Sequence, residues 1–325
     1  MFRIISNFAA MVLLAFCAQA QAQSNAGAWP NRPIRIQIAF AAGGLADVLA
    51  RSVTDRVAQT IGQPFILENK PGAGGNLAME SVVRSAPDGY TLLMIGPGLT
   101  INGSLYKKLN FDPLKDLSAI SAIAIGPYAV YVSSSIPVNN VADLIAYAKT
   151  RPGQLNYASV GIGSGGHLAG VLLALAAGVE MTHVPYKGIQ SIAPDLVSGQ
   201  VHMVFNAFGP LNAFVQSGKV KLIGVSSAKR VPQYPDVPSL SESGLPGFDA
   251  GGWYALFAPA ATPRDVVVRL NSEVVKAFGQ REVYDRVEKT GLQPSPQSLN
   301  EAAEFVRREA EKWGRAVRAS GAVAE

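Results

Sequence analysis

Apolar residues recur along this chain with two alternating periods, one typical of strands and the other of helices. Short apolar runs at 34–40, 65–69 and 90–96 predict buried strands, since turn residues bound each of them. The segments between them, 45–62 and 75–86, predict helices. In the first helix the apolar stripe consists of Leu45, Val48, Leu49, Val53, Val57 and Ile61. This strand–helix rhythm indicates βαβ units and a parallel sheet.

The same rhythm starts again in the middle of the chain. Residues 117–135 form a long apolar run rich in β-branched residues, and Gly126–Pro127 divides it. We therefore predict two consecutive strands, the first closing one sheet and the second opening another. Helices and strands then alternate. The helices are expected at 141–151, 166–178, 191–199 and 210–218, and the strands at 155–159, 181–186, 201–206 and 220–227.

The last third of the chain returns to the first pattern after a long connection. Residues 228–252 are rich in Pro, Gly and Ser and have no period, which predicts a loop. A strand at 253–260 and helices at 263–279 and 298–320 follow. Ser298 stands at the N-cap of the last helix with Glu301 three residues on, the spacing of a capping box.

These elements predict an α/β fold of two lobes, the first interrupted by the second. Lobe 1 would take 30–127 plus 250–325, and lobe 2 would take 128–249. Two crossings between lobes form a hinge, and ligands bind preferentially in such central clefts.

Composition agrees with a folded two-lobed protein. The chain has 325 residues, of which 48% are hydrophobic and 16% charged, with a net charge of +5. Its basic residues are scattered or alternate with acids, so we expect no nucleic-acid partner.

The first residues predict export. Residues 1–22 combine an early arginine, an apolar run and Ala-x-Ala sites, as in a cleavable signal peptide. Cys17 is the only cysteine, and Phe16 stands where a lipidation motif needs a small residue, so we do not expect lipidation. An exported chain without disulfides fits the Gram-negative periplasm.

Two glycine loops stand between a predicted strand and a predicted helix. The first is 41–44, "AAGG", and the second lies within 157–170, "YASVGIGSGGHLAG". A helix N-terminus offers free N–H groups, and glycines let an anion approach them. One loop alone is explained equally well by a tight turn without a ligand. Two loops in opposite lobes could hold one acidic ligand from both sides.

Several polar residues around these loops have both a structural and a ligand-binding reading. Ser164 could cap its helix, contact a ligand, or both. Asp47 could stabilise the helix start, fix the loop, or meet a ligand amine. Tyr186 and Asn206 end predicted strands of lobe 2. Each could reach the cleft, or serve as a core tyrosine and a turn cap respectively.

Other site classes fit the sequence less well. "PGAGGN" (71–76) lacks the end of a nucleotide-binding P-loop, and "GIGSGG" has no acidic partner after the next strand, so no cofactor is expected. The three histidines lack metal-ligand spacing, so no metal is expected. Ser164 and His167 suggest an exported hydrolase as an alternative, but no serine lies in a G-x-S-x-G elbow.

The order of motifs along the chain resembles one family. The motifs are "WPNRPIRIQIAFAAGGLADVLAR", "ENKPGAGGNLA", "PDGYTLL", "YASVGIGSGGHLAG", "HVPYKG", "DLVSGQVHMVF" and "GLPGFDAGGWYALFAPAATP". Together they resemble the tripartite tricarboxylate transporter substrate-binding proteins, the Bug family, from about residue 29 to the C-terminus.

The resemblance implies a type II periplasmic-binding-protein fold and a non-enzymatic, monomeric protein. It implies capture of a small carboxylate (a di- or tricarboxylate, an aromatic acid or an amino acid) and delivery to membrane transporter subunits of the tripartite tricarboxylate type. A ligand-sensing subunit for a membrane kinase would use the same fold. By the resemblance and the strand ends, the binding residues are Phe40, Ala41, Ala42, Gly43, Gly44, Asp47, Ser159, Gly163, Ser164, His167, Tyr186 and Asn206.

The chain departs from the family pattern at four positions. Ala42 replaces a frequent proline, Ala46 a frequent Thr or Ser, His202 the usual Asp, and Ala255 the usual Gly. The loss of a hydroxyl at Ala46 favours a less polar ligand.

Overall fold

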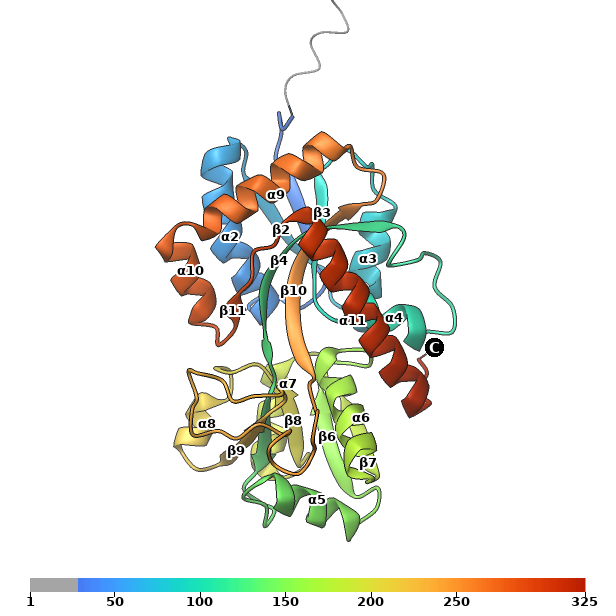
Figure 1. The fold of residues 1–325 in the computed structure, drawn as a ribbon, viewed down its shortest axis with the longest axis vertical. Helices are drawn as coiled ribbons and strands as arrows, with labels where there is room; N and C mark the ends of the chain where they lie inside the picture. Colours follow the sequence, from blue (N-terminus) through green and yellow to red (C-terminus); the bar gives the residue numbers. More distant parts are fainter. Residues whose placement is uncertain (1–28, 325) are drawn as a thin grey trace, which may run out of the picture.

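The fold consists of two α/β lobes stacked along the long axis of the molecule (Figure 1). The computed structural model describes residues 29–324. The predicted signal peptide, with Cys17, lies outside the described residues.

The first lobe is built on a six-stranded sheet with the order β11-β4-β10-β3-β1-β2. Its strands are β1 (Ile34–Ile38), β2 (Phe65–Asn69), β3 (Thr91–Ile95), β4 (Leu117–Pro127), β10 (Gly251–Pro259) and β11 (Gln293–Pro294). Strands β2, β1 and β3 are parallel, as the sequence predicts, whereas β10 runs antiparallel to β3 and β4. The antiparallel pairing arises because β4 leads out of this lobe and β10 leads back into it.

Helices cover both faces of this sheet. They are α2 (Leu45–Ile61), α9 (Arg264–Phe278) and α10 (Arg281–Glu288) on one face, and α3 (Asn76–Val83), α4 (Gly98–Leu105) and α11 (Leu299–Ser320) on the other. A 3-10 turn, η1 (Ala73–Gly75), precedes α3. The predicted capping box is confirmed, because Ser298 and Glu301 exchange both bonds at the start of α11.

The second lobe is built on a five-stranded sheet with the order β7-β6-β8-β5-β9. Its strands are β5 (Ala129–Ser133), β6 (Leu155–Ser159), β7 (Met181–Pro185), β8 (Met203–Asn206) and β9 (Val220–Val225). The helices are α5 (Val141–Lys149), α6 (Gly165–Ala177), α7 (Ile189–Ser198) and α8 (Asn212–Gln216). The predicted division of 117–135 into two strands of different sheets is confirmed by β4 and β5.

The chain crosses between the lobes twice, and one serine forms hydrogen bonds to both crossings. Tyr128, between β4 and β5, donates its backbone N–H to Ser226 Oγ at 2.8 Å. Ser226 in turn donates its hydroxyl to the carbonyl of Ala250, just before β10. Ser226 is fully buried. The two crossings are therefore bonded to each other.

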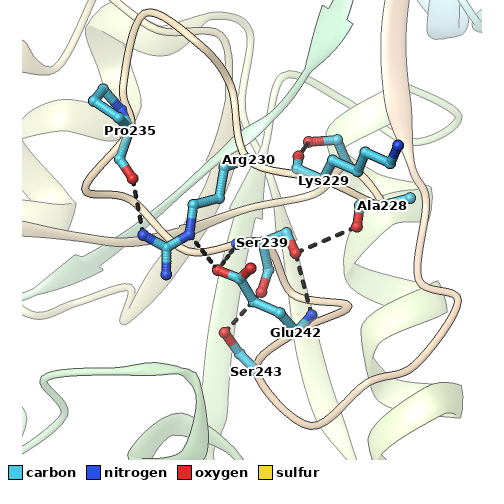
Figure 2. Close-up of polar contacts among 8 residues, drawn as sticks. Ala228, Lys229, Arg230, Pro235, Ser239, Glu242 and Ser243 are labelled. Atoms are coloured by element: carbon cyan, nitrogen blue, oxygen red, sulfur yellow. Dashed lines mark hydrogen bonds and ion pairs between the residues drawn. The ribbon is translucent and has the colours of Figure 1, made fainter.

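The long connection 228–250 is irregular, as predicted, but it is held by its own polar contacts (Figure 2). Arg230 Nε donates to Glu242 Oε1 at 2.6 Å, and Arg230 also donates to the carbonyl of Pro235 at 2.8 Å. Ser239 and Glu242 exchange two backbone-to-side-chain bonds of 3.1 Å. These contacts fix the path of the chain before it re-enters lobe 1.

Helix α11 connects the lobes a third time through packing. It starts on the first sheet and runs obliquely toward lobe 2 (Figure 1), where it contacts α6 as well as α4. Trp313 and Val317 of α11 and Leu105 of α4 belong to the same buried cluster as Leu168 and Leu173 of α6. An apolar core is thus shared between the lobes.

Candidate functional site

The first glycine loop is closed by its own aspartate. Gly43 has φ 72°, a left-handed conformation that favours glycine, and Gly44 is the N-cap of α2. Asp47 is 5% exposed, and its Oδ2 accepts the Gly43 N–H at 3.3 Å and Arg51 Nε at 3.1 Å. Of the three predicted roles of Asp47, these contacts correspond to the one in which it fixes the loop.

Electrostatics agree with this role. Burial acts to raise the pKa of Asp47, but the bonds from Arg51 and from the Gly43 N–H outweigh it and lower the pKa. On the other side of the loop, Asn69 Nδ2 donates to the carbonyl of Phe40 at 3.0 Å. Ala41 and Ala42 lie exposed between these two anchors.

The second glycine loop joins β6 to α6 and is held from behind by two histidines. Ser159 Oγ bonds His183 Nε2 at 2.7 Å and the Gly161 carbonyl at 2.9 Å. Gly163, with φ 80°, donates its N–H to His167 Nδ1 at 3.1 Å. His167 is therefore a loop-positioning residue.

The two histidine rings pack against each other at a tilt in lobe 2. Their ring centroids are 4.1 Å apart, and the Tyr157 ring lies parallel to that of His167. Burial lowers the pKa of His167 to about 4. Burial, with the neighbouring His167, lowers that of His183 to about 3. Both imidazoles are neutral at pH 7.

Ser164 is the N-cap of α6, accepting the backbone N–H of His167 at 3.4 Å. Its predicted base, the His167 imidazole, is bonded instead to Gly163 through Nδ1 and packs against the rings of Tyr157 and His183. This arrangement argues against the Ser164–His167 hydrolase, because Nδ1 already accepts a hydrogen bond. The neutral ring then carries its proton on Nε2 and has no free nitrogen to act as a base.

A third glycine turn, η1, touches the second loop across the lobe junction. A Cβ on Gly74 would lie 2.8 Å from the Ile162 carbonyl, and one on Gly163 would lie 2.7 Å from Asn102 Oδ1 of α4. Gly75 borders Ala39 on the other side, so η1 lies between the segment that follows β1 and the second loop. Only glycine allows the lobes to approach this closely here.

Asn102 holds this junction and was not found from the sequence. It is fully buried, and its Nδ2 donates to the Gly74 carbonyl at 3.1 Å and to Asn76 Oδ1 at 2.7 Å. Its Oδ1 has no partner among residues 29–324. The segment around it carries Gly98 and Gly103 and no helical stripe, so the pattern gave no signal for α4.

Aromatic side chains follow the same junction along the crossing strands. Phe40 meets Tyr254 of β10 edge to face at 6.2 Å between ring centroids. Tyr128, in the other crossing, packs against Gly252, and its hydroxyl is in contact range of Gly165, the first residue of α6. Sequence reasoning missed both tyrosines, although Tyr128 directly follows the Gly126–Pro127 break that predicts the lobe boundary.

Asn206 and Tyr186 differ in what their side chains do. Asn206 ends β8 beside Ala129, the residue after Tyr128, and its Nδ2 is buried without a partner in the described part of the chain. Tyr186 donates its hydroxyl to Asp195 of α7 at 2.6 Å. Asn206 therefore has a free donor, and the Tyr186 hydroxyl does not.

Within residues 29–324 there is no cluster of His, Cys, Asp and Glu able to hold a metal ion. The same range contains no helix whose length and apolarity would let it cross a bilayer.

Two α/β lobes, joined by two crossings and approaching each other through glycine loops, define a two-lobed solute-binding protein. The family described as "Tripartite tricarboxylate transporter family receptor" (TctC) matches residues 49–322. BugT of Bordetella pertussis is 30% identical over 300 residues, with 92% of each chain covered. The chain belongs to this TctC/Bug family of periplasmic solute-binding proteins.

Solved structures of similar proteins include two with carboxylates. The R. palustris protein Rpa4515 with adipate has TM-score 0.85 and 33% identity, covering 91% of this chain and 99% of its own. MatC from Rhodopseudomonas palustris with bound malate has TM-score 0.82 and 33% identity, covering 89% and 100%.

Proposed function

We propose that this protein captures a small carboxylate between its lobes in the periplasm and presents it to membrane transporter subunits of the tripartite tricarboxylate type. The observation that carries the proposal is the group of donors where α6 begins at the lobe junction. Asn206 follows Phe205, whose carbonyl lies 2.6 Å from a Cβ built on Gly166 of α6, and Asn206 Nδ2 is buried without a partner among residues 29–324. Buried polar groups are nearly always bonded, so an unpaired donor indicates a missing acceptor.

The start of α6 supplies further donors. Ser164 caps His167, which leaves the N–H groups of Gly165 and Gly166 in the first turn for another acceptor. The first turn of α6 contains no acidic residue, so its positive dipole end is not neutralised by the helix itself. A carboxylate is the ligand group that such a site favours.

Support also comes from the relatives. Two structures of proteins one-third identical to this chain contain dicarboxylates, adipate and malate. Loops 72–75 and 161–164 touch across the junction, so a ligand bound there would contact both lobes. Binding would then stabilise the approach of the lobes.

Thermal unfolding of the mature protein with a panel of organic acids tests ligand capture. An acid at a hundredfold excess over its Kd adds about 2.7 kcal/mol to the free energy of unfolding, which raises Tm measurably. Asn206→Ala should reduce the ligand-induced Tm shift without lowering the Tm of the free protein. Asn300 is exposed on α11, so Asn300→Ala should change neither the shift nor the Tm of the free protein. Absence of a shift with every carboxylate would contradict the proposal.

Delivery to a transporter needs a separate test. Deletion of the gene should abolish uptake of the radiolabelled acid that binds the purified protein, and expression in trans should restore it. Unchanged uptake in the deletion strain would leave a binding protein with another role, such as sensing.

A further inference from the structure

Three aromatic side chains lie beside the two glycine loops and the strand β10 between them. Phe40 directly precedes the first loop, and its ring meets Tyr254 edge to face. Tyr254 packs over Gly96 at the end of β3, 3.7 Å from a Cβ built there. Tyr128, in the other crossing, packs against Gly252, two residues before Tyr254, and reaches Gly165 at the start of α6. We call Phe40, Tyr254 and Tyr128 the aromatic stripe.

The backbone around the stripe is adapted to the rings. A Cβ on Gly252 would lie 2.8 Å from the Tyr128 ring, and a Cβ on Gly165 would collide with its hydroxyl. Both crossings and the start of α6 therefore leave room for this one side chain.

The charges around the aromatic stripe favour the binding of one anionic group. The first turn of α2 already contains the Asp47 carboxylate, which occupies the Gly43 N–H and pairs with Arg51. The first turn of α6 contains no acid. His167 and His183, behind the second loop, are neutral because burial lowers their pKa values. A bound carboxylate is therefore stabilised more at the first turn of α6 than at the first turn of α2.

A second carboxylate would meet an unfavourable surface. Burial raises the pKa of Tyr254 to about 12 and holds that of Tyr128 well above its usual value, so both remain neutral. None of the three side chains of the stripe is cationic, and aromatic faces carry negative charge density. Burying an ionised carboxylate without a cation costs several kcal/mol.

We propose that the aromatic stripe is the subsite for the body of the ligand, and that the ligand is a flat, apolar acid with a single carboxylate. The carboxylate lies at the start of α6 near Asn206, and the ring lies along Phe40 and Tyr254. This inference rests on the proposed function and narrows its ligand class to aromatic monocarboxylates.

Calorimetric titration with four acids tests the ligand class. Benzoate supplies a flat ring with one carboxylate, cyclohexanecarboxylate a puckered ring with the same charge, and adipate and malate two carboxylates. Benzoate should bind at least about tenfold more tightly than each of the other three, a difference of about 1.4 kcal/mol.

Variants of the stripe make the test specific. Phe40→Leu and Tyr254→Leu should each weaken benzoate binding about fivefold to tenfold, because an aromatic pair contributes roughly 0.5–1.5 kcal/mol. Tyr234→Leu is the matched control, since Tyr234 stacks on Phe208 within lobe 2. Its benzoate affinity should be unchanged. If Tyr254→Leu does not fold, Tyr254→Phe takes its place in the test. This variant keeps the ring and should retain most of the benzoate affinity.

The outcomes separate the two proposals. Tighter binding of adipate or malate than of benzoate, or equal binding of all four acids, would overturn the ligand class and leave carboxylate capture standing. Benzoate affinity that is unaffected by Phe40→Leu would overturn the role of the stripe. Failure of all four acids, and of the wider acid panel, to bind would overturn the proposed function itself.

Discussion

At the scale of single residues, His167 and His183 make the free energy of unfolding depend on pH. Burial holds their pKa values near 4 and 3 in the folded chain, whereas histidines in an unfolded chain titrate near pH 6.5. Below about pH 6.5 the unfolded chain therefore binds protons that the folded chain does not. The free energy of unfolding should be constant above pH 7 and fall as the pH drops toward 4.

Urea unfolding at pH 7 and pH 4.5 measures this dependence. The groups that face the two rings are Ser159, Tyr157 and the Gly163 N–H, none of which is charged at these pH values. His183→Gln should remove on the order of 2 kcal/mol of the loss between the two pH values. His202→Gln, at a less buried ring, should remove less. Equal losses in wild type and His183→Gln would refute this assignment.

Gly163 is a second residue whose role can be tested alone. Gly163 has φ 80°, and a Cβ on it would lie 2.7 Å from Asn102 Oδ1. Alanine therefore cannot be accommodated unless Asn102 or the loop moves. Gly163→Ala should weaken binding of the captured acid about tenfold or more by holding the lobes apart. Gly153→Ala has the same backbone strain but open space around it, so it should leave affinity unchanged.

At the scale of elements, α11 depends on one buried carboxylate. Glu309 is 9% exposed, and its Oε2 accepts the indole N–H groups of Trp253 at 3.0 Å and Trp313 at 2.9 Å. Lys312 lies 2.6 Å from Oε1. Glu309 thereby attaches α11 to β10.

Glu309→Ala should destabilise the protein by about 3 kcal/mol or more, because it leaves two buried indole N–H groups without an acceptor. Glu309→Gln should cost less, since its amide oxygen can accept both indoles. Glu311→Ala, which removes an exposed ion pair with Arg307, should cost under about 1 kcal/mol. Chemical denaturation of the three variants provides the comparison, and equal effects of Ala and Gln at 309 would contradict the argument.

The predictability of these elements from sequence follows from their apolar pattern. Helix α2 shows a complete stripe and was placed within one residue of its observed end. The short helices α4 and α10 were missed. Gly98 and Gly103 weaken the helical signal of α4, and α10 buries only Val283 and Val287. The antiparallel pairing of β10 with β4 also has no local signal, because its partner lies far along the chain.

At the scale of the whole molecule, local motifs located the glycine loops but not what they face. Asp47, Ser164 and His167 act on their own loops, within four residues along the chain, so sequence spacing could suggest their roles. Tyr128, Tyr254 and Asn102 matter because the lobes meet at them. Their neighbours come from distant segments, which no periodicity reveals.

The apolar cluster shared by α4, α6 and α11 has a consequence for how temperature acts on this protein. Any rotation that separates α6 from Trp313 and Leu105 would expose buried hydrocarbon to water. Exposure of apolar surface raises the heat capacity, so the balance between separated and joined lobes should change with temperature even when no ligand is present. The heat-capacity change measured on ligand binding should then be more negative than the buried surface of the ligand alone can explain.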